Sequence, residues 1–385
     1  MPIQFTVFER KIVRKLAELK KQSGSHSPSP AMLRDISGVK VKHDFCFLSN
    51  PHATDLFLKY WKRDFGNAES MRKLVEQYPS QNRTLAKKLE KTTGVQAQRI
   101  FVGNGATEVI QAALNNFAGR KILVPIPTFS PYLEFAPKGV QVILHQLQKE
   151  NNFLLDTNAF LVQVKKEKPD TVVIINPNNP DGGYARENTL HLFLSRLRHV
   201  GTVIVDESFI HFTQKKIESV SELAKKYPNL VVIKSFSKDF GVAGLRLGYG
   251  VMSEKRVSFL LERGYLWNVS GFGEYFLNLL NSRRFMKEYE MARLLSIRER
   301  DDFFARLSRI SGLKVYPSKA NLFLVELLDG SRAEDLTVRL LAKYGIYIRS
   351  CADKAGLRGE FVRIASRKQA ENNTLIQTLR HALTE

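Results

Sequence analysis

Cysteine is scarce in this chain of 385 residues, which contains only Cys46 and Cys351. The two lie far apart in the sequence, so the pattern excludes a disulfide framework and a cysteine-rich metal site. We therefore predict no metal, and we expect the protein to reside in a reducing cytoplasm.

Long apolar runs are also lacking, because no stretch approaches the roughly 18 apolar residues of a membrane span. The N-terminal segment "MPIQFTVFERKIVRKLAELKK" has no continuous apolar core of the kind found in secretory signals. Its spacing predicts a basic amphipathic helix, followed by a Ser/Pro-rich hinge, "SGSHSPSP". We expect this helix to be a surface arm or to pack on a partner subunit rather than to bind a membrane.

Acidic residues are few compared with basic ones, 38 against 59, which gives a formal net charge of +21. Such a charge attracts polyanions, nucleic acid included. The basic residues are dispersed, however, and no basic segment is interleaved with aromatic residues. The charge favours a solvated surface and is compatible with a small anionic substrate, so a nucleic-acid partner is not expected.

Short apolar runs alternate with helical patterns through the middle of the chain, which predicts an α/β fold with a mostly parallel sheet sandwiched by helices. The predicted strands include "RIFVG", "KILVPIP", "VQVILHQL", "TVVIINP", "GTVIVDE", "LVVIKS" and "LRLGYGVM". From about Gly273 to Ile310 the apolar spacing predicts one long helix. A smaller α+β part follows, with strands in "NLFLVEL", "YGIYIRS" and "EFVRIAS". We predict an arm and linker at 1–45, a large domain at 46–280 and a small domain at 281–385.

Four loops that follow predicted strands carry polar residues of chemical interest. "GNGATE", residues 103–108, is a glycine turn into a helix, where free amide groups favour a phosphate, although many such turns are only structural. "NPNNPDGG", residues 176–183, is a rigid turn with asparagine-proline bonds that are candidates for cis geometry. Asp206 ends an apolar strand in "VDESF", and a carboxylate there is either solvated or held against a positive partner. Lys238 in "SFSKDFGVAGLRLGY" lies where a strand gives way to a loop, yet most lysines are merely solvated.

The order and spacing of these loops resemble those of the fold type I pyridoxal-phosphate enzymes of the aspartate aminotransferase superfamily, over roughly residues 45–385. By this resemblance, Lys238 bonds to the cofactor aldehyde and later moves a proton, Asp206 pairs with the pyridine nitrogen, and Asn179 donates to the ring's phenolate oxygen. Phe129 resembles the aromatic residue that stacks on the ring. The resemblance assigns the cofactor phosphate to Gly105, Ala106, Thr107, Ser235, Ser237 and Arg246.

The resemblance also implies a homodimer, in which Tyr78 of "YPSQN" reaches the cofactor phosphate of the neighbouring subunit. Arg363 in "FVRIAS" is similar to the arginine that binds the substrate's α-carboxylate. The remaining residues that it implies or suggests for the substrate are Arg349, Arg367, Asn50, His52, Trp267 and Asn268. His52 is as compatible with the surface as with a substrate phosphate.

Within the superfamily the chain resembles threonine-phosphate decarboxylases and histidinol-phosphate aminotransferases. "GNGATE", Phe209 in "DESFIHF" and "IRSCADKAGLRGEFVRIASR" favour the decarboxylases. We therefore predict a decarboxylase of a small O-phospho-amino acid, of the phosphothreonine or phosphoserine type. The alternative is an aminotransferase of the histidinol-phosphate type, and a third hypothesis is a non-enzymatic polyanion-binding protein on the same scaffold.

The chain also departs from the family pattern at three places. "DFCFLSNPHATDLF" replaces the usual substrate loop, Asp181 stands where threonine is typical, and the first 30 residues or so match no part of the pattern. The first departure leaves the contacts of the substrate's distal group open.

Overall fold

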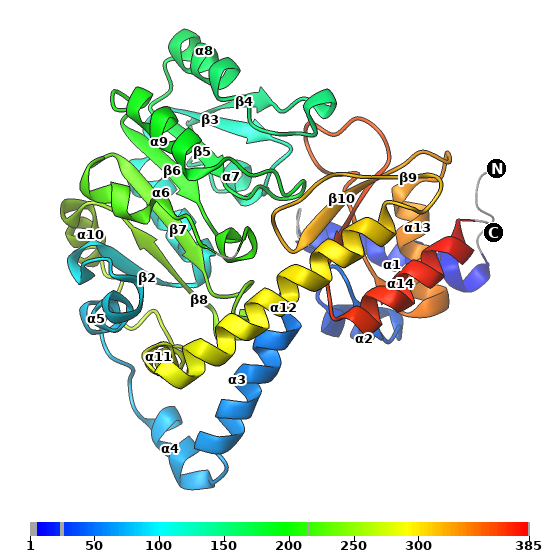
Figure 1. The fold of residues 1–385 in the computed structure, drawn as a ribbon, viewed down its shortest axis with the longest axis horizontal. Helices are drawn as coiled ribbons and strands as arrows, with labels where there is room; N and C mark the ends of the chain where they lie inside the picture. Colours follow the sequence, from blue (N-terminus) through cyan, green and yellow to red (C-terminus); the bar gives the residue numbers. More distant parts are fainter. Residues whose placement is uncertain (1–5, 24–26, 215, 384–385) are drawn as a thin grey trace.

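A seven-stranded sheet is the central element of this computed structural model, which describes residues 6–23, 27–214 and 216–383 (Figure 1). In spatial order its strands are β2 (Ile100–Asn104), β8 (Leu247–Val251), β7 (Leu230–Ser235), β6 (Thr202–Asp206), β5 (Thr171–Ile175), β3 (Lys121–Ile126) and β4 (Gln141–Gln146). β8 runs antiparallel to both of its neighbours, and the other pairs are parallel. The predicted α/β fold with a mostly parallel sheet is confirmed.

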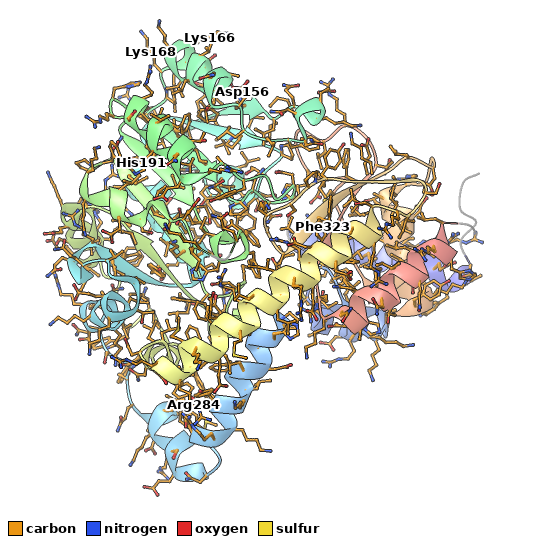
Figure 2. All side chains as sticks on the ribbon, in the orientation of Figure 1. Asp156, Lys166, Lys168, His191, Arg284 and Phe323 are labelled. Carbon is orange, nitrogen blue, oxygen red and sulfur yellow. The ribbon has the colours of Figure 1, made fainter. Side chains whose placement is uncertain are left out.

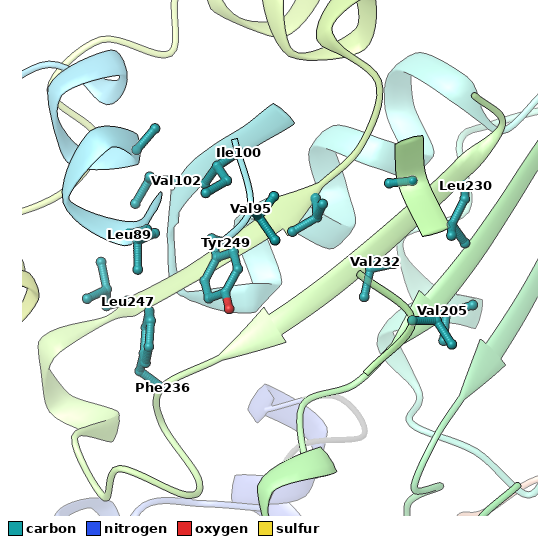
Figure 3. Close-up of a cluster of buried hydrophobic side chains, with 14 of the residues drawn as sticks. Leu89, Val95, Ile100, Val102, Val205, Leu230, Val232, Phe236, Leu247 and Tyr249 are labelled. Atoms are coloured by element: carbon teal, nitrogen blue, oxygen red, sulfur yellow. The ribbon is translucent and has the colours of Figure 1, made fainter. Parts of the chain in front are cut away.

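Helices cover both faces of this sheet, so its strands are apolar on both sides. In β6, Val203 and Val205 pack on one face and Ile204 on the other. One face is covered by α5 (Asn82–Thr93), α8 (Thr157–Glu167), α9 (Glu187–Arg196) and α11 (Gly271–Leu280), the other by α6 (Gly105–Phe117), α7 (Pro131–Glu134) and α10 (Glu254–Leu261). Figure 3 shows the first face, where Val205 and Val232 lie in a layer with Leu89 of α5. Each such buried side chain stabilises the fold by about 1.5–3 kcal/mol.

A second core forms around an antiparallel sheet in the order β12-β13-β10-β9. Its strands are β9 (Leu313–Val315), β10 (Leu322–Leu327), β12 (Arg349–Ser350) and β13 (Phe361–Ala365), with α13 (Ala333–Arg339), the π-helical turn η6 (Leu340–Tyr344) and α14 (Gln369–Ala382). The predicted strand in "YGIYIRS" is split, because β11 (Ile346–Tyr347) pairs instead with β1 (His43–Asp44). This pairing brings residues 45–50 alongside the second sheet.

The predicted single helix over 273–310 is wrong, since the segment forms α11 and a separate α12 (Arg283–Leu307). The two helices are separate because a new helix begins after Ser282. The Oγ of Ser282 accepts a hydrogen bond from the amide of Phe285 at 3.3 Å and so caps the start of α12. α12 contributes Tyr289 to the first core and Phe303 to the second. Figure 2 shows Arg284 near the start of α12 and Phe323, a residue of the second core, close to its other end.

The N-terminal segment forms α1 (Val7–Ser23), as predicted, followed by α2 (Pro30–Ser37). Ile12 and Leu19 of α1 are buried against Val338, Leu341 and Tyr347 of the same chain. In the structure the apolar face of the helix therefore packs on α13, η6 and β11 of its own chain, rather than standing out as a surface arm.

The remaining helices are α3 (Pro51–Asp64), α4 (Ala68–Glu76) and the short turns η1 (Ala97–Arg99), η2 (Lys149–Asn151), η3 (Ile210–Phe212), η4 (Val220–Lys225) and η5 (Ala243–Leu245). Among the described residues, no helix is both long and apolar enough to cross a bilayer.

Candidate active site

The four loops singled out in the sequence meet at one edge of the large sheet, where β5, β6 and β7 end and α6 begins. Ligands of such sheets bind at the carboxyl ends of the strands. One cavity is lined there by nine of the predicted cofactor residues: Ala106, Thr107, Phe129, Asn179, Asp206, Ser235, Ser237, Lys238 and Arg246. Residues spread over 140 positions of the sequence therefore share one site.

Lys238 is the ionisable amine of this cavity. Burial lowers the pKa of its side chain to about 8, and the positive charges of Arg363 and Arg246 act in the same direction, while Asp206 opposes them. A larger fraction of the amine is therefore neutral near pH 7 to 8 than in a solvated lysine. A neutral amine is the form that attacks an aldehyde.

Asp206 is buried at the end of β6, not solvated as the residue alone would suggest. Tyr132 donates its hydroxyl to Oδ2 at 2.8 Å, and the amide of Ser208 donates to Oδ1 at 2.8 Å. Burial raises the pKa of Asp206, while these two hydrogen bonds and the charge of Lys238 oppose that shift. A protonated ring nitrogen beside Asp206 would supply the positive partner that a buried carboxylate needs.

Gly105 and Arg246 form a seat for an anion at the start of α6. Gly105 has a φ of +77°, and a Cβ on it would lie 2.5 Å from Nη2 of Arg246, so only glycine permits this approach. The cap residue Asn104 makes no side-chain hydrogen bond to the helix, which leaves amide groups of its first turn free. No carboxylate pairs with Arg246 among the residues that the structure describes.

Arg363 connects the second sheet to this cavity. From β13 it donates to Oδ1 of Asn179 at 2.9 Å and to the carbonyl oxygen of Cys46 at 2.7 Å. Its buried Nε has no partner among the described residues. All of these hydrogen-bond partners are neutral, so the guanidinium is a half-buried cation beside the cofactor residues that forms no ion pair among the described residues.

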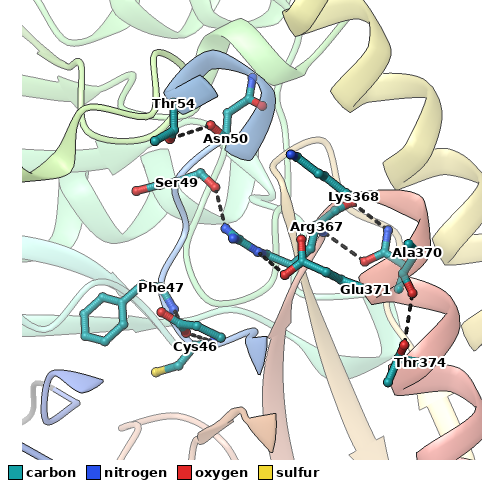
Figure 4. Close-up of polar contacts among 12 residues, drawn as sticks. Cys46, Phe47, Ser49, Asn50, Thr54, Arg367, Lys368, Ala370, Glu371 and Thr374 are labelled. Carbon is teal, nitrogen blue, oxygen red and sulfur yellow. Dashed lines mark hydrogen bonds and ion pairs between the residues drawn. The ribbon is translucent and has the colours of Figure 1, made fainter. Parts of the chain in front are cut away.

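Arg367 and Arg349 are engaged more fully than Arg363. Figure 4 shows the Arg367 side chain directed at Ser49, whose carbonyl oxygen accepts at 3.0 Å, and at Glu371 of α14, 3.5 Å away. Arg349 pairs with Asp353 at 2.6 Å. Arg367 therefore fixes residues 45–50 against α14, and Arg349 carries a charge that is already compensated.

Asn50 and His52 lie at the start of α3, but their side chains have different surroundings. Asn50 is fully buried. Its backbone amide donates to the backbone carbonyl of Lys238 at 2.7 Å, and its side chain caps α3. Its Nδ2 has no partner in the described part of the chain. His52 instead pairs with Glu299 of α12 at 2.6 Å, in a groove between α3 and α12 that the cavity does not reach. The structure thus brings Asn50, but not His52, to the site.

Tyr78, Trp267 and Asn268 lie outside the cavity. The rings of Tyr78 and Trp267 stand 5.4 Å apart and are exposed by 83% and 50%. Asn268 donates to Glu108 of α6 at 2.6 Å and to the carbonyl of Val102, so it positions the start of α6 within its own chain. A direct substrate contact by Asn268 has no support here.

Four residues of the cavity or its support were not identified from the sequence. Tyr132 and Ser208 hold Asp206, and Ile110 and Ile175 contribute to the wall. Tyr132 lies in "PTFSPY" with Phe129, and this neighbourhood was the one feature of the sequence that could have indicated its place at the site. Asp181, which departs from the family pattern, is buried and accepts from Asn178 and from the amide of Gly183, which stiffens the loop that carries Asn179.

The residues fit pyridoxal phosphate on the chemistry of the donor set. A phosphate matches the seat at Gly105 and Arg246, a pyridinium matches buried Asp206, and the Nδ2 of Asn179 remains to donate because its Oδ1 is used by Arg363. Lys238 supplies the amine.

Comparisons with known proteins agree with this fit. The family model for aminotransferase class I and II matches residues 62–379. An L-serine phosphate decarboxylase of Campylobacter jejuni is 48% identical over 98% of both chains, and one of Sulfurospirillum multivorans is 42% identical over 95% of both. The solved structure of a decarboxylase from Sulfurospirillum multivorans has a TM-score of 0.89 at 40% identity, covering 98% of this chain and 99% of that one.

These matches correct one expectation from the sequence. Alignment over 98% of the chain extends into the N-terminal segment, so the arm does have a counterpart in relatives. With the model match spanning most of the sequence, the chain belongs to the pyridoxal phosphate-dependent aminotransferase class I and II family.

Proposed function

We propose that this protein is a pyridoxal phosphate-dependent decarboxylase that converts O-phospho-L-serine to O-phosphoethanolamine and carbon dioxide. The observation that carries the proposal is the near full-length similarity to two L-serine phosphate decarboxylases, at 48% and 42% identity. Phosphothreonine differs from phosphoserine by one methyl group, and a single methyl group is worth only about 1–3 kcal/mol of discrimination. We therefore treat phosphothreonine as the second substrate to test.

The charges around the cavity support an anionic substrate. Arg363 is half-buried, its hydrogen-bond partners are neutral, and its buried Nε has no partner among the described residues. A substrate α-carboxylate would supply its counter-charge through a charge-assisted hydrogen bond. Asn179, which already contacts Arg363, would then hold the cofactor ring and the bound carboxylate in a fixed relation.

The roles of the protein's own groups follow from the geometry. Pyridoxal phosphate supplies an electron-accepting ring that takes up the electron pair left when the carboxylate departs as carbon dioxide. Asp206, held by Tyr132 and Ser208, keeps a positive charge at the ring nitrogen. Gly105 and Arg246 hold the phosphate, and Lys238 delivers a proton to the α-carbon in place of the lost carboxylate.

Phe209 supports decarboxylation over transamination. It lines the cavity and is buried among Leu48, Phe212 and Leu322, so it offers no hydroxyl to the ring. Asn179 is then the side chain left to donate to the phenolate oxygen. An Arg363 contact to the carboxylate would hold that group in one orientation toward the bound cofactor.

The decisive experiment incubates purified holoenzyme with O-phospho-L-serine and no keto acid. We expect carbon dioxide and O-phosphoethanolamine in equal amounts, and no activity from Lys238→Ala. Amino-group transfer that requires 2-oxoglutarate, without carbon dioxide release, would favour the aminotransferase alternative. Salt-sensitive binding of a polyanion with no turnover would favour the binding protein.

We further propose that the enzyme is a cytoplasmic homodimer in which Tyr78 reaches the cofactor phosphate bound by the partner subunit. Support comes from the large exposure of Tyr78 and Trp267. An aromatic pair of this kind at the surface is typical of a protein interface.

A further inference from the structure

Lys354 lies on the connection between β12 and β13 and reaches the large sheet beyond the end of β3. Its Nζ donates to the carbonyl oxygen of Thr128 at 3.3 Å and to Oγ of Ser130. These two residues flank Phe129, which lines the cofactor cavity. The ammonium group is therefore held beside the wall of the active site, although the motifs that identified the site did not include it.

The connection that carries Lys354 is anchored to both sheets. Cys351 is buried, and its amide donates to the carbonyl of Phe361 at 2.9 Å. Gln146, at the end of β4, donates to the carbonyl of Gly356 at 2.9 Å. Gly356 itself has a φ of +87° and lies so close to Ile126 that a Cβ would come within 3.1 Å of its carbonyl carbon. Lys354 is thus presented at a fixed place between these anchors.

Lys354 is half-buried, and its charge has no direct ion-pair partner. In the described part of the chain no carboxylate oxygen lies within ion-pair distance of its Nζ, and its hydrogen-bond partners are neutral. Burial lowers the pKa of Lys354 to about 8, the nearby charges of Arg349 and Arg363 act in the same direction, and Cys351 and Asp353 oppose the shift. Arg349 pairs with Asp353, whereas Lys354 and Arg363 form no ion pair among the described residues. Two cations without ion pairs beside one cavity match a ligand with two anionic groups.

We propose that Lys354 is a specificity-determining residue that binds the phosphate group of the substrate. The inference rests on the proposed function, in which Arg363 takes the α-carboxylate and leaves the second cation for the phosphate. The ammonium exchanges its contact with Ser130 Oγ for phosphate oxygens, and the freed hydroxyl of Ser130 donates to the same group. Ser130 is nearly buried, so this hydroxyl needs a partner in both states.

The test compares Lys354→Met and Lys354→Arg with wild-type holoenzyme. Lys138→Met is the matched control, because Lys138 is an exposed lysine on the connection before β4 and its loss changes the net charge equally. For Lys354→Met we expect KM for O-phospho-L-serine to rise roughly 10- to 100-fold, with a smaller change in kcat. Lys354→Arg should recover part of the loss, and Lys138→Met should behave as wild type.

A binding measurement separates recognition from turnover. Calorimetric titration of each holoenzyme with O-phosphoethanolamine should show the same roughly 10- to 100-fold loss of affinity for Lys354→Met. The visible absorbance of the bound cofactor and the thermal midpoint should match those of wild type, which shows that the variant is folded and loaded.

The outcomes distinguish this inference from the proposed function. A wild-type enzyme that releases no carbon dioxide from O-phospho-L-serine overturns the proposed function, and this inference with it. An active wild type, together with a Lys354→Met variant that keeps its KM and its affinity for O-phosphoethanolamine, overturns only the role of Lys354. If Lys354→Met fails to fold, Lys354→Gln and Ser130→Ala decide the matter, because unchanged KM and O-phosphoethanolamine affinity in both overturn the role.

Discussion

At the residue scale, the environment of Lys238 turns an ordinary lysine into an amine that is partly neutral at physiological pH. Burial and two nearby arginines disfavour its protonated form, and Asp206 alone among the charges acting on it favours that form. The same cavity keeps Asp206 buried and hydrogen-bonded. The lowered pKa of Lys238 favours the neutral amine that attacks an aldehyde. The buried, hydrogen-bonded Asp206 favours a cation at the cofactor ring.

This tuning predicts how cofactor capture depends on pH. The pKa of Lys238 is lowered to about 8, so the rate at which apoenzyme captures pyridoxal phosphate should rise with pH and level off above about 8. Stopped-flow visible absorbance measures this rate. A rate that keeps rising toward pH 10.5, the ordinary lysine pKa, would show that the environment does not lower the pKa.

Tyr132 gives a second prediction, because its hydroxyl donates to the buried Asp206 at 2.8 Å. Tyr132→Phe removes this charge-assisted hydrogen bond, so kcat should fall roughly 10-fold and cofactor affinity should weaken. Steady-state kinetics and titration of apoenzyme with pyridoxal phosphate measure both. Tyr227→Phe, remote from the cavity, serves as the control. Equal cofactor affinity and kcat in Tyr132→Phe and wild type would exclude this role.

Motifs at strand ends predicted most of the cavity, because a residue that follows a buried strand has a nearly fixed place at the sheet edge. Asp206 and Lys238 are of this kind. Tyr132 and Lys354 were missed because their contacts join residues distant in sequence, as in the pair of Lys354 with Ser130, 224 positions apart. The sequence left His52 open between the surface and a substrate phosphate, and in the structure it pairs with Glu299 of α12.

At the element scale, α12 joins the two cores and also supports the cavity. Arg293, fully buried on α12, donates to the carbonyl oxygens of His211 and Gln214 at 2.7 and 2.8 Å. Arg300, two turns further on, donates to the carbonyl of Phe212 at 2.5 Å. These bonds fix η3, which directly follows Phe209 in the cavity wall.

Arg293→Met should therefore lower the free energy of unfolding by about 1–3 kcal/mol or more, since it leaves two backbone carbonyls without their donor. Denaturant unfolding of the holoenzyme measures the change. Arg284→Met is the control on the same helix, because the Arg284 side chain is 76% exposed and its pair with Glu288 contributes about 0–1 kcal/mol. Equal losses in the two variants would contradict the proposed role of α12.

The sequence predicted the strands of the large sheet well, because strands buried on both faces appear as continuous apolar runs. It failed at the junction of α11 and α12, where apolar spacing continues and only the capping bond of Ser282 separates the helices. It also failed in "YGIYIRS", where the pairing of β11 with β1 depends on a segment 300 residues away. The domain limits at residues 45 and 280 stay a prediction.

At the scale of the whole molecule, the proposed dimer connects the surface to the active site. If Tyr78 reaches the cofactor of the partner subunit, Tyr78→Phe should leave the protein dimeric and lower cofactor affinity roughly 3- to 10-fold, through loss of one hydrogen bond. Light scattering and cofactor titration measure the two properties. A monomeric wild type, or a variant with unchanged cofactor affinity, would argue against the arrangement.

The net charge of +21 and the N-terminal helix also belong to this scale. α1 packs on α13, η6 and β11, and α13 in turn contacts β12 and β13, the strands of Arg349 and Arg363. The positive charge is consistent with attraction of an anionic substrate. Arg363 and Lys354, which form no ion pair among the described residues, are the groups at the cavity that would bind it.

The central claim is that the α-carboxylate leaves and a proton takes its place at the same carbon. Nuclear magnetic resonance of the reaction in deuterium oxide tests it most directly. Decarboxylation should give O-phosphoethanolamine with a single deuterium at the former α-carbon, formed without any keto acid. Recovery of O-phospho-L-serine that has exchanged its α-hydrogen for deuterium, with no O-phosphoethanolamine and no loss of carbon dioxide, would contradict it.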